Sequence, residues 1–575
     1  TPGSDKREIF CTGTRFPVAM AFNEEGDLFA TDQEGATCWH PGLCLPNGNP
    51  FDELLHIQEG RHYGFPPRNP KYLPTVIDEP SVFDYKPQHQ STCGINFNLP
   101  VNNGPAFGPS WWRGDAFLAG YSRGKIYRTK LVKTDAGYVA ENSIIACLIS
   151  LTVDACISPK GDMVVSTHSG FPDWGFGPKA KGKLYKIVHN NTDLPNPVAT
   201  WTSKPDEVSI AFDKPVNREY LKNLADKITI KYGQYTHPGD RFEVVRPGYK
   251  TVERQLRFPV ENLEVKNVAL SENGRTLIIT TFQHILPNTY AITLPYFSND
   301  EKLANSVKQS RTYDLAYTLN GVYVSWQSNS GSQKWNGWLP HLDMKVSKAF
   351  MEPVAEYNDM QKALIQPGTV TWKTQLNLLN MLRPELQPES PLDYTVPPED
   401  VTVVFRSSEA LQIKVSEPAI VSPSVKKGDL YETGITFNKV TRRGYPLEIT
   451  MNTSSKEPVL LVHYYTNEDP RARALQIHRF FVPWASEIFD KETLGSETEI
   501  AELAGGNWSR GRKLFYTEAL CANCHTIGGK GKDIGPDLSN LIFKDYTSVL
   551  RDIHDPSSAI NPDYVGHTVV LKDKT

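Results

Sequence analysis

The chain has 575 residues, with 61 Lys and Arg against 65 Asp and Glu, and a formal net charge of −4 at pH 7. This balance argues against a nucleic-acid-binding protein, which usually carries a basic stripe, and no run reaches the 18 apolar residues of a transmembrane helix. Hydrophobic residues make up 39% of the chain, enough to bury a core. The 43 Pro and 40 Gly are spread along the sequence and favour a mainly β protein of several domains.

Both ends of the sequence look trimmed. The chain begins at Thr1 without an initiator Met, and it ends at Thr575 directly after a strand-like stretch. We therefore expect a mature or trimmed piece of a longer protein, with an unusual natural terminus as the alternative.

Six of the eight cysteines lie before residue 160. Two pairs among them, Cys38 with Cys44 and Cys147 with Cys156, are close enough in sequence to form disulfides. Six cysteines allow 15 connectivities, so spacing does not decide the pairing. Buried free thiols are the alternative.

A short phrase recurs in the first 190 residues. Gly26–Asp32 (GDLFATD) is followed by Gly114–Gly120 (GDAFLAG) and Gly161–Thr167 (GDMVVST), at spacings of 88 and 47 residues. After the second and third copies, a Gly-Lys step opens another apolar stretch. This rhythm is typical of four-stranded propeller blades of about 45 residues. Residues 1–190 are therefore predicted to form β-propeller blades, four at most, within a larger propeller, and an ordinary β-sandwich is the alternative.

The segment Asp52–Pro66 (DELLHIQEGRHYGFP) resembles a phrase of the quinoprotein glucose and sorbosone dehydrogenases. It departs from that phrase at His56 and Phe65, where the family usually has Asn and Trp. The resemblance implies a six-bladed propeller that uses pyrroloquinoline quinone and calcium. It also implies that Asp52 and Glu53 help to hold calcium, a cation that prefers oxygen ligands. Two exposed turn carboxylates are the alternative.

The same family uses a His as catalytic base, and no motif places that base here. His40, His62, His89 and His168 lie in this part of the chain, and a structural role is favoured for each. The loop Gly170–Pro178 is rich in Gly, Pro and aromatic residues. It would suit a saccharide site or a rigid connection between blades.

The middle of the chain alternates apolar and polar residues but is poor in chemical motifs. The alternation predicts strands at Glu207–Asp213, Lys227–Lys231, Arg275–Thr281, Thr289–Leu294, Val401–Phe405 and Val459–Tyr464. Residues 191–300 are predicted to form an immunoglobulin-like β-sandwich. Residues 301–490 are predicted to form a second β-rich domain with a helical insert near Lys345–Leu364. The segment Trp335–Asp343 is aromatic enough for carbohydrate stacking, although a core anchor is favoured. The usual hydrolase, kinase and nicotinamide motifs are lacking.

The strongest signal lies near the C-terminus. Cys521-Ala-Asn-Cys524-His525 is the C-x-x-C-H motif of c-type haem attachment. Two thiols three positions apart can both add to one porphyrin, and the next residue then presents an imidazole to the iron. A zinc half-site would need two more ligands, and no other Cys lies within 360 residues of the pair. A thioredoxin-like pair would need a βαβ setting, which is missing.

The residues around the motif resemble those of class I cytochromes c. Ser509–Tyr516 is predicted to form a short amphipathic helix, in which Gly511 lets another helix cross closely and Phe515 faces the haem. After the motif, Gly528–Leu538 resembles the loop whose Pro carbonyl accepts the ring N–H of the axial His, and Pro536 takes the matching position.

A second helix is predicted at Tyr546–Ile553. Residues 491–575 are therefore predicted to form a cytochrome c domain that is incomplete at its C-terminus. The sixth iron ligand is left open. Class I cytochromes usually supply a downstream Met, and all seven Met precede Cys521. The favoured interpretation is that the chain ends before its Met; otherwise His554 or His567 binds the iron, or the position is open.

As a whole, the chain resembles large exported bacterial dehydrogenase-like proteins with a C-terminal cytochrome c domain. The resemblance implies a periplasmic or exported haem protein that oxidises a sugar-like alcohol or aldose. Its electrons would pass to the haem and then to a soluble or membrane carrier. The alternative is a non-catalytic electron-transfer protein whose β domains dock a partner or a polysaccharide. Enzyme activity is therefore undecided at this point.

Overall fold

In the computed structural model, the chain divides into two compact units, one of residues 1–255 with 263–496 and the other of residues 256–262 with 497–575. No helix among the described residues is long and apolar enough to cross a bilayer. The structure describes residues 7–33, 51–65, 76–88, 90–169, 181–189, 194–240, 258–297, 312–382, 398–416, 418–485, 508–527, 530–532, 534–538 and 546–555.

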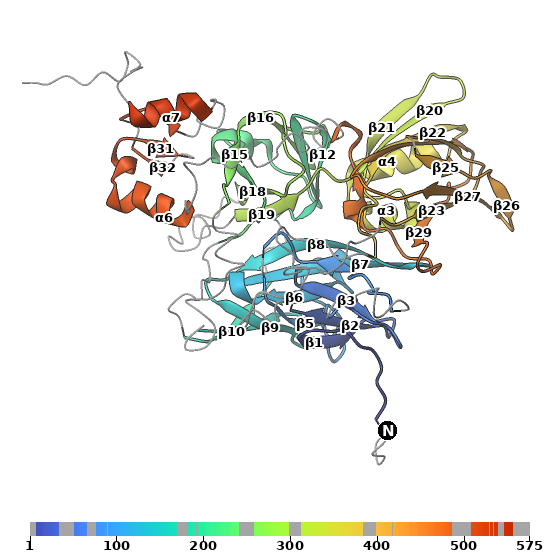
Figure 1. Ribbon diagram of the computed structural model, residues 1–575, viewed down its shortest axis with the longest axis horizontal. Helices are drawn as coiled ribbons and strands as arrows, with labels where there is room; N and C mark the ends of the chain where they lie inside the picture. The colour runs from blue at the N-terminus through green and yellow to red at the C-terminus, as the bar shows by residue number, and fades with distance from the viewer. Residues whose placement is uncertain are drawn as a thin grey trace, which may run out of the picture. The chain divides into compact units, whose positions relative to one another are not determined.

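Three antiparallel sheets follow one another in the first 190 residues (Figure 1). Strands that are consecutive in sequence are neighbours in each sheet, so each sheet is a meander: β1-β2-β3-β4, β5-β6-β7-β8 and β9-β10-β11. The strands are β1 (Pro17–Phe22), β2 (Leu28–Asp32), β3 (Glu53–Ile57), β4 (Phe83–Asp84), β5 (Thr92–Phe97), β6 (Ala116–Gly120), β7 (Lys125–Thr134), β8 (Gly137–Cys147), β9 (Leu151–Ile157), β10 (Met163–His168) and β11 (Leu184–Ile187).

The repeated Gly-Asp phrase occupies the same place in all three sheets. Gly26, Gly114 and Gly161 lie in the turn before the second strand, with φ of 84°, 86° and 77°. Glycine adopts this left-handed conformation at little cost because it has no Cβ. The first strands of successive sheets contact each other, β1 with β5 and β5 with β9. The described residues thus give three blade-like meanders, and a closed propeller stays a prediction.

Apolar side chains from opposite faces of the second sheet fill two cores. Leu118 packs with Phe29 and Leu54 of the first sheet, whereas Phe117 packs with Val165 of the third. Adjacent residues of one strand point to opposite faces. The uninterrupted apolar sequence of β6, AFLAG, therefore lets one strand contribute to both cores.

Two four-stranded sheets form the next part, in the orders β12-β13-β17-β16 and β15-β14-β18-β19. Strands β13, β14, β17 and β18 agree with the strands expected from alternation. The second sheet continues to Tyr317, beyond the predicted boundary at residue 300. The strands are β12 (Pro197–Lys204), β13 (Glu207–Phe212), β14 (Thr229–Tyr232), β15 (Glu261–Leu263), β16 (Val265–Leu270), β17 (Thr276–Thr281), β18 (Tyr290–Pro295) and β19 (Thr312–Tyr317).

Two larger sheets and two helices make up residues 322–481. One sheet has the order β21-β20-β22-β28-β24, with β30 beside β22, and the other has the order β25-β27-β23-β29, with β26 beside β27. The strands are β20 (Val322–Ser328), β21 (Lys334–Leu339), β22 (Gly368–Leu376), β23 (Val401–Ser407), β24 (Gln412–Val415), β25 (Ala419–Val421), β26 (Val425–Lys427), β27 (Leu430–Phe437), β28 (Tyr445–Thr453), β29 (Leu460–Thr466) and β30 (Phe480–Phe481).

The predicted helical insert consists of α3 (Met344–Met351) and α4 (Ala355–Leu364). Asp343 caps α3, because its carboxylate accepts the N–H groups of Lys345 and Val346. Just before it, Trp338 stacks on Trp201 with 5.5 Å between ring centroids and donates to the carbonyl of Asn320. Trp338 is therefore a core anchor, the favoured interpretation of that aromatic segment.

Short 3-10 helices connect several strands: η1 (Ser110–Trp112), η2 (Tyr121–Arg123), η3 (Arg218–Leu221), η4 (Ala225–Lys227), η5 (Ile477–Arg479) and η6 (Pro483–Ala485). Cys147 in β8 and Cys156 in β9 do not form the disulfide considered from their spacing. Cys38 and Cys44 lie outside the described residues.

The C-terminal unit is small and helical. It contains α6 (Trp508–Lys513), the π-helix η8 (Leu514–Glu518), the 3-10 helix η9 (Cys521–Asn523), the short strands β31 (Thr526–Ile527) and β32 (Lys530–Gly531), and α7 (Tyr546–His554). The two helices expected from sequence are present as α6 with η8 and as α7 (Figure 1). A Cβ added to Gly511 would meet no described atom within 4 Å, and the close helix crossing expected there stays a prediction.

Candidate functional site

The C-x-x-C-H segment is folded into a tight turn. The N–H groups of Cys524 and His525 both donate to the carbonyl of Cys521, at 3.1 and 2.9 Å. Leu520, just before the turn, has a left-handed φ of 56°, a conformation that costs a non-glycine residue of order 1–3 kcal/mol. Strain of this size is tolerated where the surrounding contacts determine the backbone. In this turn, both thiols and the imidazole lie within one five-residue segment.

The loop after the motif closes against the same segment. The N–H of Lys532 donates to the carbonyl of Ala522 at 2.8 Å, and the N–H of Gly535 donates to the carbonyl of Cys524 at 2.6 Å. A π-helix, η8, precedes the motif, and such helices often mark functional sites. The hydroxyl of Tyr516 in η8 donates to the carbonyl of Ile527 at 3.4 Å. The segment is thus supported from both sides.

The ring of His525 is oriented by Pro536. His525 Nδ1 lies 2.9 Å from the carbonyl oxygen of Pro536, the contact expected from the sequence. Since that carbonyl can only accept, Nδ1 carries the proton, and Nε2 keeps the lone pair that binds a metal. A Cβ added to Gly535 would lie 2.8 Å from Cε1 and 2.9 Å from Nδ1 of His525, so only glycine fits against the ring.

Several large apolar side chains of the C-terminal unit are exposed. Five large ones in the C-terminal unit have 39–67% of their surface exposed: Leu514, Leu520, Ile527, Ile534 and Ile553. Covering exposed apolar groups lowers the free energy, so such groups favour a bound apolar partner. Two thiols, an imidazole of fixed tautomer, a glycine cradle and apolar surroundings together fit a haem c. That Phe515 faces the haem stays a prediction.

The described structure does not test the sixth-ligand candidates. His554 is the last residue of α7 and is exposed. His567 lies outside the described residues. Both stay predictions.

The predicted calcium ligands Asp52 and Glu53 are placed by β3 of the first sheet. Asp52 is buried rather than exposed, and its Oδ2 accepts the N–H groups of Gln90 at 2.8 Å and Ser91 at 2.7 Å. In the described part of the chain, no group of three or more His, Cys, Asp or Glu side chains is arranged to hold a metal. Two backbone N–H groups thus already bond Oδ2 of Asp52, which gives this carboxylate a structural role. Calcium binding at Asp52 and Glu53 stays a prediction.

The candidate histidines of the N-terminal part make local contacts. His62 Nδ1 lies 2.9 Å from Asp78 Oδ1, and His168 Nδ1 lies 3.0 Å from the hydroxyl of Tyr121. His40, His89 and the loop Gly170–Pro178 lie outside the described residues.

Sequence reasoning missed a buried ionic cluster between the sheets and residues 237–240. Lys125 Nζ donates to Asp240 Oδ1 at 2.6 Å and lies 2.9 Å from His237 Nδ1. Burial and the positive charge of Lys125 lower the pKa of His237 to about 3. The partners are more than 100 residues apart, so no local pattern could have revealed them.

Comparison with protein families identifies the C-terminal segment. Residues 508–562 match the family described as Cytochrome c. This segment is a cytochrome c domain. The domain contains the turn at Cys521, the axial candidate His525 and the carbonyl of Pro536. A search of curated proteins found no match to the chain.

Solved structures similar to this chain include sugar dehydrogenases. A glucose dehydrogenase-like oxidoreductase of Thermus thermophilus is 18% identical, with a TM-score of 0.25, over 33% of this chain and 52% of its own. The pyrroloquinoline quinone-bound aldose sugar dehydrogenase of Streptomyces coelicolor is 16% identical, with a TM-score of 0.24, over 32% and 47%. The soluble aldose sugar dehydrogenase of Escherichia coli, in its apo form, is 18% identical, with a TM-score of 0.21, over 31% and 46%. The chain thus spans about half the length of these structures, and scores this low carry no functional conclusion.

Proposed function

We propose that this protein transfers electrons through a haem c bound at Cys521, Cys524 and His525. The observation that carries the proposal is the 2.9 Å contact between His525 Nδ1 and the carbonyl of Pro536, inside a C-x-x-C-H turn. It directs Nε2 of His525 outward as a ligand. The match of residues 508–562 to cytochrome c supports the same assignment.

A bound haem supplies reversible one-electron chemistry. This chain's residues anchor and orient it: the two thiols fix its position, and the carbonyl of Pro536 holds the imidazole. That hydrogen bond also makes the imidazole a stronger donor to iron. Attachment of haem c occurs outside the cytoplasm, so the proposal includes export to the periplasm or beyond. A soluble or membrane electron carrier would be the redox partner.

The β-rich unit is proposed to supply the electrons by oxidising a sugar-like alcohol or aldose. The phrase Asp52–Pro66 and the three blade-like meanders support this proposal. The alternative is that the β domains dock a partner or polysaccharide without turnover. In that case the bonding of Asp52 Oδ2 to two backbone N–H groups is structural only.

One absorption experiment tests both levels of the proposal. The oxidised holoprotein is mixed with calcium, pyrroloquinoline quinone and a panel of aldoses, and the reduced c-type α band is followed. A rise with one sugar supports the dehydrogenase, whereas a rise with dithionite alone supports the carrier. In parallel, acid-acetone extraction should leave the haem on the unmutated protein, and Cys524→Ala should lose the two-thioether spectrum. Release of haem from unmutated protein would overturn covalent attachment.

A further inference from the structure

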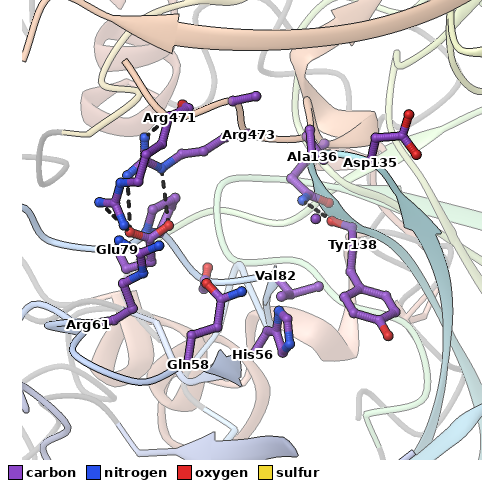
Figure 2. Close-up of a pocket in the computed structure, with 16 residues that line it drawn as sticks. His56, Gln58, Arg61, Glu79, Val82, Asp135, Ala136, Tyr138, Arg471 and Arg473 are labelled. Atoms are coloured by element: carbon purple, nitrogen blue, oxygen red, sulfur yellow. Dashed lines mark hydrogen bonds and ion pairs between the residues drawn. The ribbon is translucent and has the colours of Figure 1, made fainter. Parts of the chain in front are cut away.

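A polar cavity lies far from the C-x-x-C-H motif in sequence, within the β-rich unit. Its volume is about 230 Å³. Four separate stretches of chain line it: the end of β3 and the following turn, residues 79–82, the β7–β8 hairpin, and residues 471–476 after β29. Figure 2 shows Arg61 and Glu79 on one side of the cavity and Asp135 and Tyr138 on the other.

One wall of the cavity is a network of ion pairs. Arg473 holds Glu79 with two hydrogen bonds, from Nε and from one terminal nitrogen, both at 3.1 Å. Arg471 also donates to Glu79, at 3.3 Å (Figure 2). Asp469, behind the wall, accepts from Arg473 at 2.7 Å and from Nε of Arg471 at 2.6 Å. Both carboxylates are therefore fully used by two guanidinium groups.

Arg61 is the third guanidinium of this wall, and neither carboxylate is its partner. Among the described residues, Arg61 makes no ion pair and its side chain donates no hydrogen bond, and its Nε is buried without an acceptor. One terminal nitrogen of Arg471 is likewise buried without an acceptor. A buried donor without an acceptor costs about 1–3 kcal/mol. Among the described residues, three guanidinium groups face two carboxylates, so one positive charge of this wall has no partner carboxylate there.

The opposite side of the cavity offers rings and hydrogen-bonding groups. His56 and Tyr138 meet edge to face, with centroids 5.1 Å apart. The carboxylate of Asp135 pairs with Arg406 at 3.8 Å and is largely exposed. Gln58 is exposed at the rim, and its side chain makes no hydrogen bond among the described residues. Rings beside polar groups suit a ligand that has both ring faces and hydroxyl groups.

We propose that this cavity binds a sugar acid, with the ligand's carboxylate on Arg61. One uncompensated guanidinium matches a monoanion, and Asp135 across the cavity disfavours a second negative charge. A planar guanidinium can hold a carboxylate with two parallel hydrogen bonds. The volume lies below the roughly 300 Å³ at which pockets for drug-sized ligands begin, so the ligand is a single hexuronate-sized unit. This inference does not depend on the haem proposal.

Titration calorimetry at low salt with D-glucuronate tests the inference, with D-glucose and sodium sulfate as comparison ligands. We expect D-glucuronate to bind and D-glucose to bind at least about tenfold more weakly, since it lacks the charge-assisted contact. Arg61→Met should weaken D-glucuronate binding by about tenfold or more. Arg61→Lys keeps the charge but loses the planar guanidinium group. Its affinity for D-glucuronate should therefore lie between those of the unmutated protein and Arg61→Met.

The matched control is Arg218→Met, which removes an exposed guanidinium that donates to the carbonyl of Ser271 at 3.2 Å, away from the cavity. It should bind D-glucuronate like the unmutated protein. The side chain of Arg61 forms no hydrogen bond or ion pair with the described residues. Arg61→Met should therefore keep the thermal midpoint, which separates lost binding from lost folding. Unchanged affinity in Arg61→Met, or equal binding of D-glucose, would overturn the proposal. Sulfate binding as tightly as D-glucuronate would also overturn it, because the site would then recognise charge alone.

Discussion

The haem site and the region of Asp52 were both predicted from short phrases, but they are built differently. At the C-terminus, the motif spans five residues, and the carbonyl that orients His525 is only 11 positions further on. The carboxylate of Asp52, in contrast, accepts hydrogen bonds from backbone N–H groups that lie 38 and 39 residues further along the chain. A sequence motif predicts a functional site well when the groups that contact it are close in sequence. When those groups are distant in sequence, the motif predicts mainly the fold.

The largest expected effect comes from Gly535→Ala. The new Cβ would lie 2.8 Å from Cε1 and 2.9 Å from Nδ1 of His525, and 3.3 Å from the carbonyl of Cys524. Ring and loop must separate, which breaks the hydrogen bond to Pro536. We expect the haem's reduction potential and its pH profile to change, measured by redox titration of the α band.

Gly511→Ala is the matched control within the same unit. Its Cβ would meet nothing within 4 Å, and alanine favours the helix α6 by up to about 1 kcal/mol. The haem spectrum and potential should stay as in the unmutated protein. Equal potentials in the Gly535→Ala and unmutated proteins would contradict the role given to the Pro536 contact.

The same contrast explains what the sequence could predict. Strand positions such as β13, β17, β23 and β29 followed from alternation, and the blade-like meanders followed from the repeated Gly-Asp turn, because both signals are local. The bonding of Asp52, the cluster of Lys125 with Asp240 and the ion pairs of the cavity wall depend on pairings across 38 to 394 residues. Such pairings are set by the packing of sheets, which no single phrase encodes.

Acid should destabilise the β-rich unit through its buried histidines. Burial lowers the pKa of His284 and of His341 to about 4. Because the folded pKa lies below the unfolded value of about 6.5, the stabilisation is complete above pH 6.5. It is lost as pH falls from 6.5 towards 4. Each His can contribute up to about 1.4 kcal/mol per pH unit in that window.

Urea unfolding followed by tryptophan fluorescence at pH 7.5 and pH 5 measures this loss. The transition should move to lower urea at pH 5, and by less in His341→Gln, which removes one titrating group. The exposed His554 supplies the control, since His554→Gln should leave the shift unchanged. An identical shift in His341→Gln and the unmutated protein would assign the acid sensitivity to other groups.

Asp52→Asn separates the structural role of this carboxylate from a role in metal binding. The amide keeps the shape but weakens the charge-assisted bonds from the N–H groups of Gln90 and Ser91, so we expect a loss of about 1–3 kcal/mol in unfolding free energy. The neighbouring Glu53→Gln, on the half-buried start of β3, is the control and should cost less. If the role of Asp52 is structural, millimolar calcium should leave the urea midpoints of the unmutated protein and of both variants unchanged. The contrary outcome is a urea midpoint that rises with calcium in the unmutated protein and in neither variant. It would place a calcium ion at both carboxylates, and the region of Asp52 would then hold a cofactor as the haem site does.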